Sequence, residues 1–241
     1  YYWCYYFEVP ANKATVSVTR GNLAKNSYWK EYGKPAVPKP GNITGLKIGG
    51  RATDALRLNW SKNDSAEGYI VEQNKNGKWT RIARIGSNST VTWRISGLSA
   101  STSYQFRVQA FNFSGSTPQY SGYQYINGTT LPTAVTGVKI GGRATDALRL
   151  NWNKNSKASG YIIEQNKSGK WTRIARIGNN STVTYRIAGL QASTKYQFRI
   201  QAFGFDGSTP LYSGWQYING ITLPTAVTGL KIGGTARDAL R

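Results

Sequence analysis

Apolar and polar side chains alternate with a period of two in several short segments of this chain. In 55–60 (ALRLNW), Leu56 and Leu58 fall on one side, whereas Arg57 falls on the other. Segment 104–110 (YQFRVQA) alternates in the same way, with aromatic and aliphatic residues at every second position. Because successive side chains of a strand point to opposite faces, this pattern predicts β-strands that each bury one face.

Further segments show the same period and are separated by turn residues. In 68–73 (GYIVEQ), Tyr69 and Val71 are expected to point inward and Ile70 outward. A tight turn with an Asn-Gly tip is expected in 74–79, since this dipeptide favours hairpins. Additional strands are predicted in 78–86, in 90–98 and around 123–126. Turns recur about every 8 to 12 residues, which is typical of two packed sheets.

A long internal repeat organises the chain. Residues 43–132 align without a gap with 135–224 at an offset of 92, and the two segments differ at 19 of 90 positions. Residues 227–234 begin a third copy, which ends at Arg241. A repeat of this length is a complete small domain, since solenoid units have about 20 to 47 residues. We therefore predict modules with separate cores, and we expect the parent protein to continue past Arg241.

The repeat divides the chain into four predicted parts. Residues 41–132 and 133–224 are two complete modules, and 225–241 is the truncated start of a third. Residues 1–40 are interpreted as the end of a partial or diverged preceding module plus a Pro-rich linker, because 5–11 (YYFEVPA) aligns with the strand YQFRVQA. An unrelated N-terminal tail is the alternative. Short linkers that contain proline favour a semi-rigid rod over a flexible chain.

Each repeat carries a tryptophan, a leucine and tyrosines at fixed spacing. In the first repeat these are Trp60, Tyr69, Leu98 and Tyr104, and in the second Trp152, Tyr161, Leu190 and Tyr196. This arrangement resembles the fibronectin type III family, although the turn before Tyr104 lacks the proline that the family often has. The resemblance implies an all-β fold of tandem immunoglobulin-like, seven-stranded β-sandwiches, in which the Tyr104 hydroxyl bonds nearby backbone. No Arg-Gly-Asp triplet occurs, so integrin binding is not carried over.

The charge balance bears on partners. The chain has 31 Lys and Arg against 10 Asp and Glu, for a formal net charge of +21. This balance indicates an acidic partner, such as nucleic acid, an anionic cell-wall polymer, an acidic polysaccharide or a membrane surface, or else serves solubility alone. No dedicated nucleic-acid motif is recognised, which disfavours that partner. The single Cys4 allows no intrachain disulfide, and no apolar run reaches the ~20 residues of a membrane span.

The residues needed for catalysis are missing or dispersed. The chain has no His, which removes the commonest general base and the usual triads. Asp64 and Glu67 are close in sequence, but the second repeat has Ser at both positions, so they are interpreted as a solvated turn. Phosphate-binding loops and metal-ligand clusters are not recognised. We therefore predict no enzyme activity, no cofactor and no metal site.

Two recurring surface features are candidates for binding. A basic hairpin with an adjacent tryptophan occurs in both repeats, and anionic polymers would meet this positive charge once per module. Its residues are Lys75, Lys78, Trp79, Arg81 and Arg84, repeated as Lys167, Lys170, Trp171, Arg173 and Arg176. Aromatic residues near the last strand could stack on sugar rings or join the core, and these are Tyr120, Tyr123 and Tyr125, repeated as Tyr212, Trp215 and Tyr217. A solvated hairpin is the alternative for the basic residues.

Three functions are compatible with these patterns. The leading one is a bacterial cell-surface or secreted array that acts as spacer and adhesive surface, binding an anionic cell-wall polymer or a glycan. The second is an accessory region of a secreted cell-wall or polysaccharide hydrolase. The third is a filament subunit, in which the short segment 225–241 completes the sandwich of another chain by strand addition.

Overall fold

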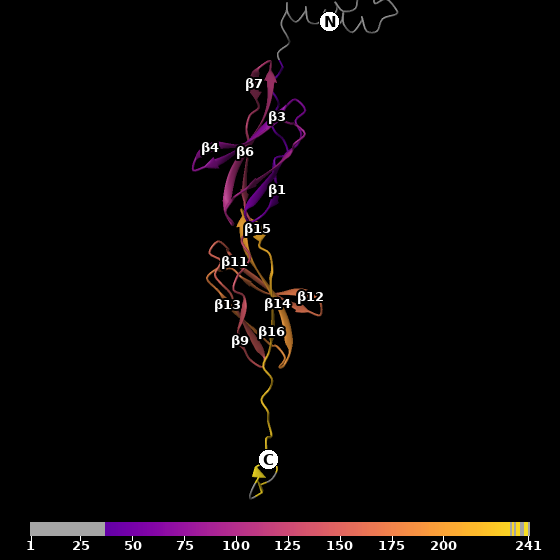
Figure 1. The fold of residues 1–241 in the computed structure, drawn as a ribbon, viewed down its shortest axis with the longest axis vertical. Coiled ribbons are helices and arrows are strands. Elements are labelled where there is room, and N and C mark those ends of the chain that lie inside the picture. Colours follow the sequence, from indigo (N-terminus) through magenta and orange to yellow (C-terminus); the bar gives the residue numbers. More distant parts are fainter. Residues whose placement is uncertain (1–36, 232, 234, 237–238, 241) are drawn as a thin grey trace, which may run out of the picture.

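The computed structural model describes residues 37–231, 233, 235–236 and 239–240, and these residues form strands without helices. Two β-sandwiches follow one another along a long axis (Figure 1). The predicted all-β fold is thus confirmed. Of the predicted partial module and linker in 1–40, residues 1–36 lie outside the described residues.

Each module consists of two sheets. In the first module the strands are β1 (Lys47–Arg51), β2 (Ala55–Asn59), β3 (Gly68–Lys75), β4 (Lys78–Ile85), β5 (Thr92–Ser96), β6 (Ser103–Ser114), β7 (Thr117–Tyr120) and β8 (Gln124–Thr129). In the second they are β9 (Lys139–Arg143), β10 (Ala147–Asn151), β11 (Gly160–Lys167), β12 (Lys170–Ile177), β13 (Thr184–Ala188), β14 (Lys195–Asp206), β15 (Thr209–Tyr212) and β16 (Gln216–Ile221). One sheet has the order β1-β2-β5, and the other has the order β4-β3-β6-β7 with β8 also paired to β6. The second module repeats both sheets.

Each module has eight strands, one more than the seven that the family resemblance implied, and the additional strand precedes the last predicted one. Strand β6 is 12 residues long, and both β7 and β8 pair with it. Strands β7 and β8 are separated at Ser121, whose backbone N–H donates to Ala110 O at 2.9 Å and whose Oγ accepts from Ala110 N at 2.8 Å. The sequence pattern predicts β8 but not β7, because Thr117–Tyr120 has no apolar alternation.

The cores consist of the side chains that alternation placed inward. Leu58, Tyr69, Val71 and Phe106 are fully buried, and the rings of Trp60 and Tyr69 meet edge to face at 5.3 Å. The second module has an equivalent cluster around Leu150, Trp152, Tyr161, Ile163 and Phe198. These separate cores confirm that each repeat has its own hydrophobic interior.

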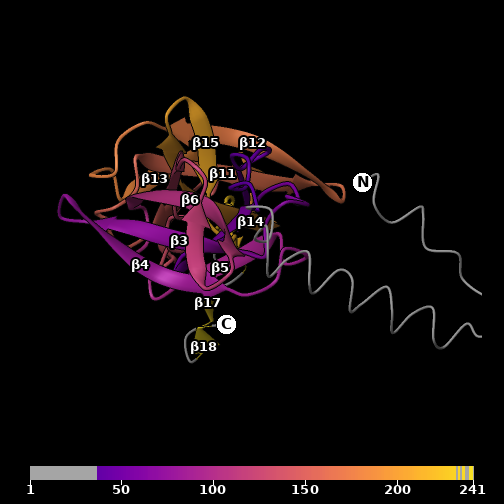
Figure 2. The same cartoon turned by 90° about the horizontal axis from the view of Figure 1, so that it is seen from above.

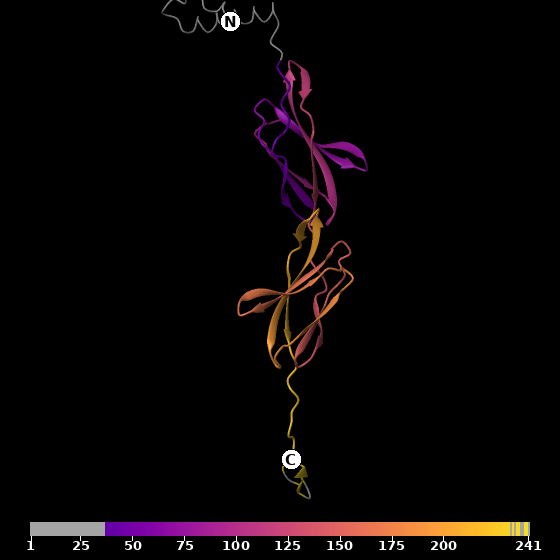
Figure 3. The ribbon, with the colours of Figure 1, turned by 180° about the vertical axis from the view of Figure 1, so that it is seen from behind.

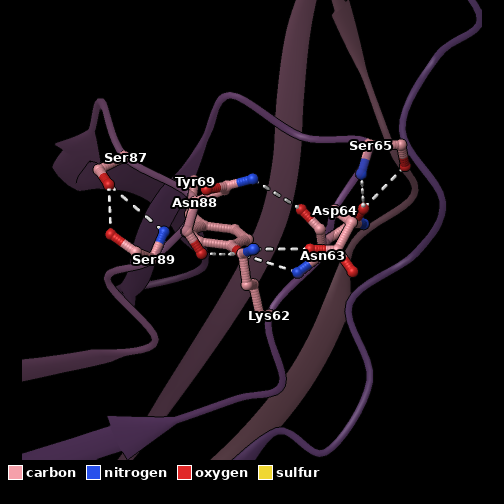
Figure 4. Close-up of polar contacts among 8 residues, drawn as sticks. All are labelled: Lys62, Asn63, Asp64, Ser65, Tyr69, Ser87, Asn88 and Ser89. Atoms are coloured by element: carbon pink, nitrogen blue, oxygen red, sulfur yellow. Dashed lines mark hydrogen bonds and ion pairs between the residues drawn. The ribbon is translucent and has the colours of Figure 1, made fainter.

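Two tyrosines per module, one buried and one partly buried, bond backbone groups through their hydroxyls. Figure 4 shows Tyr69, whose hydroxyl accepts from Asn63 N at 2.9 Å and donates to Asn88 O at 3.0 Å. The Tyr104 hydroxyl accepts from Ser99 N at 2.8 Å, as the family resemblance implied. Because a buried hydroxyl without a partner is costly, these bonds fix the loops at each end of a module.

One inward–outward expectation needs correction. Ile70 shares the outer face of its sheet with Glu72, as expected, but only 4% of its surface is exposed. Its cross-strand neighbours are Arg84 and Gln109, and the Arg84 guanidinium lies 4.4 Å from the centre of the Phe111 ring. Side chains therefore cover part of the sheet face that the alternation assigned to solvent.

The predicted third module is represented by a short segment. Strands β17 (Thr235–Ala236) and β18 (Ala239–Leu240) pair with each other. Figure 1 shows this segment beyond the second module, near the C-terminus. Strand addition to another chain stays a prediction.

Candidate binding surface and module junction

The predicted basic hairpin forms as expected. Asn76 and Gly77 have φ angles of 54° and 84°, which suit a tight two-residue turn, and Asn74 Oδ1 accepts from Gly77 N at 2.8 Å. This turn sets Lys75 directly opposite Lys78 at the tip. The β3–β4 hairpin projects sideways from the module (Figure 1), so both lysines are exposed.

The other basic residues of the hairpin lie further along β4. Arg81 is the cross-strand partner of Glu72, and Arg84 stacks on Phe111. Lys75 and Lys78 thus lie together at the tip of the hairpin. Arg81 and Arg84 lie apart from them, beside Glu72 and Phe111 of the same sheet. In the second module the tip residues are Lys167 and Lys170, and the others are Arg173 and Arg176.

Trp79 belongs to a stack of aromatic rings around one arginine. The Arg107 guanidinium carbon lies 4.6 Å from the centre of the Trp79 ring and 3.7 Å from that of Tyr123. Glu72 accepts from Arg107 Nε at 2.7 Å, and Tyr125 meets Trp79 edge to face at 5.6 Å. We call Glu72, Trp79, Arg107, Tyr123 and Tyr125 the aromatic–arginine ladder. Its second copy is Glu164, Trp171, Arg199, Trp215 and Tyr217.

The ladder changes the acidity of its members. Burial lowers the pKa of Arg107, but hydrogen bonds to Glu72 and Tyr125 outweigh this and leave the pKa above its ordinary value. Burial raises the pKa of Tyr123, and the negative charge of Glu72 raises it further. The guanidinium therefore stays charged between rings that stay neutral, which favours cation–π attraction.

Sequence analysis placed Trp79 on the surface as a binding residue and missed its partner. Trp79 is half-buried, and Arg107 covers one side of its ring. The alternation in 104–110 places Arg107 on the outer face of its strand and gives no sign of its partners. The most exposed aromatics near the last strand are Tyr125 and Tyr217, each 62% exposed.

The acids of the first module do not converge. Asp64 forms an ion pair with Lys62 at 2.7 Å (Figure 4), whereas Glu67 accepts from Phe113 N at 3.2 Å. Hydrogen bonding to Asp64 raises the pKa of Lys62. Within the described part of the chain, no group of three His, Cys, Asp or Glu side chains is arranged to hold a metal ion. No helix among the described residues is long and apolar enough to cross a membrane.

A polar contact joins the two modules end to end. Asp206, at the end of β14, accepts from Arg51 at 2.5 Å and from Thr129 Oγ1 at 2.8 Å. Arg51 also donates to Thr129 O at 2.6 Å, so the three residues form a closed set that we call the module junction. The Arg51 and Asp206 side chains are each only 21% exposed. Figures 1 and 3 show the β14–β15 hairpin of the second module reaching the base of the first.

The junction uses residues that differ between the repeats. Asp206 corresponds to Ser114 in the first module, whose Oγ accepts from Val37 N at 3.3 Å. Thr129 corresponds to Ile221, whose carbonyl accepts from Arg143 at 3.4 Å. The backbone part of the arrangement is therefore repeated, but its ion pair is specific to this boundary.

The chain is similar to parts of several larger proteins. The chain is 26% identical to receptor-type tyrosine-protein phosphatase eta of Mus musculus over 83% of its own length and 16% of that protein. It is also 26% identical to chitinase A1 of Niallia circulans, over 80% of the chain and 26% of the enzyme. A two-domain fibronectin type III segment of chicken tenascin has 18% identity and a TM-score of 0.45, with 76% of this chain and 99% of that chain covered. The chain thus spans about a quarter or less of the curated relatives' length.

The family model named "Fibronectin type III domain" matches residues 38–123 and 133–213. These two matches cover more than half of the chain, and each begins with one sandwich and ends just before its last strand, β8 or β16. The chain therefore belongs to the fibronectin type III family and carries two of its modules in tandem.

Proposed function

We propose that this chain is a non-catalytic spacer array outside the cell, which holds its modules in a fixed line and offers basic surfaces to an anionic polymer. The module junction is the observation that carries this proposal. A charge-assisted contact between half-buried groups restricts how one module turns against the next. A fixed orientation of each module relative to the next keeps the array extended, which a spacer needs. Modules that act independently of one another do not need a fixed relative orientation.

The junction can be tested with Asp206→Asn in the whole chain. Residual dipolar couplings of the unaltered protein should fit one alignment tensor for both modules, because the modules tumble together. Asp206→Asn should require two different tensors, since the amide cannot replace the ionic contact with Arg51. The matched control is Asp64→Asn, which makes the same chemical change at an exposed ion pair. A single tensor for Asp206→Asn would contradict a junction that holds the modules.

The binding part of the proposal rests on charge and position. The formal net charge is +21, and the exposed hairpin tips Lys75–Lys78 and Lys167–Lys170 recur once per module. Such surfaces attract acidic cell-wall polymers or glycans, a role that suits a bacterial surface protein. Sedimentation with purified cell walls at about 0.15 M ionic strength tests this part. Absence of binding would leave the spacer role alone.

A second candidate is an accessory region of a secreted polysaccharide hydrolase. It is favoured by the similarity to chitinase A1, of which this chain matches 26% of the length. In that case the catalytic domain would lie in the same parent protein. Sequencing the parent gene on both sides of this region decides between the candidates, because a catalytic domain would be directly visible.

A further inference from the structure

A second basic surface lies on the sheet opposite the hairpin. In the first module, Arg57 of β2 is the direct cross-strand partner of Arg94 of β5. In the second module Arg149 and Arg186 are paired in the same way. All four side chains are exposed. Like charges directly opposite each other destabilise a sheet, so the fold alone gives no reason for this pairing.

Polar and basic neighbours complete the surface. Lys47 pairs with Asn59, which pairs with Thr92, so these residues share the outer face with Arg57 and Arg94. Asn59 Oδ1 accepts from Thr92 Oγ1 at 2.8 Å. All five residues are identical in the second module, where they are Lys139, Arg149, Asn151, Thr184 and Arg186. We call each set of five an arginine face.

The bulge in the first strand shapes the arginine face. The register of β1 against β2 shifts between Ile48 and Gly50. A Cβ on the intervening Gly49 would overlap the Asn59 carboxamide, so glycine allows that side chain to lie flat on the strand. In the second module the face borders a hollow of ≈ 570 Å³, lined by Lys139, Arg149, Asn151 and Thr184 among others. In the second module, the arginine face thus combines cations, an amide group and a recess.

The charge of the arginine face is poorly balanced by the protein. Asp54 lies 3.7 Å from Arg94, and Asp146 lies 3.5 Å from Arg186. Among the described residues, no acid forms an ion pair with Arg57 or Arg149. Each face therefore keeps an excess of positive charge around planar guanidinium groups, which suit carboxylate, sulfate and phosphate.

Each side of the two-module rod carries a basic hairpin from one module and an arginine face from the other. In Figures 1 and 3, the β4 hairpin of the first module lies on the same side of the long axis as β9 and β13 of the second. The β12 hairpin lies on the side of β1. A linear ligand running along one side would meet a hairpin on one module and an arginine face on the next.

We propose that the arginine faces are the principal binding sites for an acidic polysaccharide, a linear sugar polymer with repeated carboxylate or sulfate groups. This inference deepens the proposed function by naming the surface and the ligand. The paired arginines supply planar donors for the acidic groups, and Asn59 and Asn151 supply amide groups for the sugar hydroxyls. The ligand charge offsets the repulsion that the sheet otherwise retains.

The test compares two double variants of the whole chain that remove the same charge. Arg57→Gln/Arg149→Gln alters the arginine faces, and Lys75→Gln/Lys167→Gln alters the hairpin tips. Calorimetric titration uses polygalacturonate for carboxylate, dextran sulfate for sulfate, and neutral dextran as a blank, at about 0.15 M ionic strength. The arginine variant should bind one of the two polyanions about tenfold more weakly or worse, and the lysine variant less than about threefold more weakly.

Several outcomes would overturn the inference. Equal losses in the two variants would indicate attraction by net charge alone. Loss in the lysine variant only would move the site to the hairpin and leave the proposed function intact. A single-stranded DNA that binds more tightly than both polysaccharides would replace the ligand class. Absence of binding by the unaltered chain would remove both this inference and the polymer-binding part of the proposed function, whereas the spacer role is judged separately by the dipolar couplings.

Discussion

At the scale of single residues, Arg107 organises the outer face of the five-stranded sheet. Its guanidinium lies between the rings of Trp79 and Tyr123 and binds Glu72, so one side chain links three strands and the segment before β8. A planar guanidinium can contact one ring on each of its two faces and still donate hydrogen bonds to a carboxylate at its edge, which a lysine ammonium cannot do. The ladder therefore stabilises the module, and of its three rings only that of Tyr125 is mostly exposed.

Replacing Arg107 by Lys keeps the charge but removes the planar group. We expect the first module to lose about 1–2 kcal/mol of unfolding free energy, because two ring contacts and a carboxylate contact are weakened. Urea unfolding followed by tryptophan fluorescence measures this loss. Arg94→Lys is the control, since Arg94 is exposed and no ring among the described residues stacks on it, and it should change stability by less than about 0.5 kcal/mol.

Tyr123 makes the ladder sensitive to alkaline pH. Burial and Glu72 raise the pKa of Tyr123 above the ordinary value of 10.0, so the folded state favours the neutral phenol. The associated stability is fully present below the pKa of an unfolded tyrosine and is lost as pH rises through the folded pKa. The absorbance difference between the unaltered chain and Tyr123→Phe should show a tyrosine that ionises above 10. Ionisation at the ordinary value would contradict the partial burial of the Tyr123 hydroxyl beside Glu72.

At the scale of strands, the arginine face is an exception to favourable cross-strand pairing. Alternation assigns Arg57 and Arg94 to the outer face correctly, but it does not reveal that they are partners, since partnership depends on the register of β2 against β5. A sheet selected only for stability would place opposite charges or β-branched residues there. The repetition of this pair in both modules is consistent with a role in binding.

Arg57→Thr should therefore stabilise the first module. The change removes one of two opposed charges and introduces a residue that favours strands, so we expect a gain of about 0.2–1 kcal/mol in unfolding free energy. The contrast is Arg81→Thr, which removes the same charge from a position opposite Glu72 and should not stabilise. Chemical denaturation measures both variants. A loss of stability in Arg57→Thr would show that the arginine pair supports the fold.

Sequence alone predicted most of the strands and the core, because alternation depends on neighbours in the chain. Leu58, Val71 and Phe106 were placed correctly for this reason. The ladder was not predicted, since Arg107 and Glu72 are 35 positions apart and both read simply as outward residues. The hairpin tip was predicted because its turn is encoded by the adjacent Asn76 and Gly77.

At the scale of the whole molecule, the module junction couples two separate cores. Arg51 and Asp206 are 155 positions apart. Asp206 is not part of the repeated pattern, because the equivalent residue in the first module is Ser114. Such a contact was inaccessible to sequence analysis, which predicted stiffness from the proline in the linker. The described contacts add an ionic restraint to that linker.

A double-mutant cycle should detect this coupling. Arg51→Met, Asp206→Asn and the combined variant should give an interaction free energy of about 1 kcal/mol, because the two groups are mostly shielded from water. Thermal unfolding of the whole chain supplies the four stabilities. The coupling should decrease in high salt, since ions compete for both charges. A coupling near zero would mean that packing, and not the ion pair, holds the modules.

The hairpins β3–β4 and β11–β12 point away from the long axis in opposite directions, as the view from above in Figure 2 also shows. Basic hairpins are therefore present on two opposite sides of the molecule. Under the proposed function, each side would bind a separate polymer chain, and the width of the array would set the distance between the two chains. A further module joined in the same way would place its hairpin opposite that of the module before it, so a longer array would present more basic hairpins on both sides.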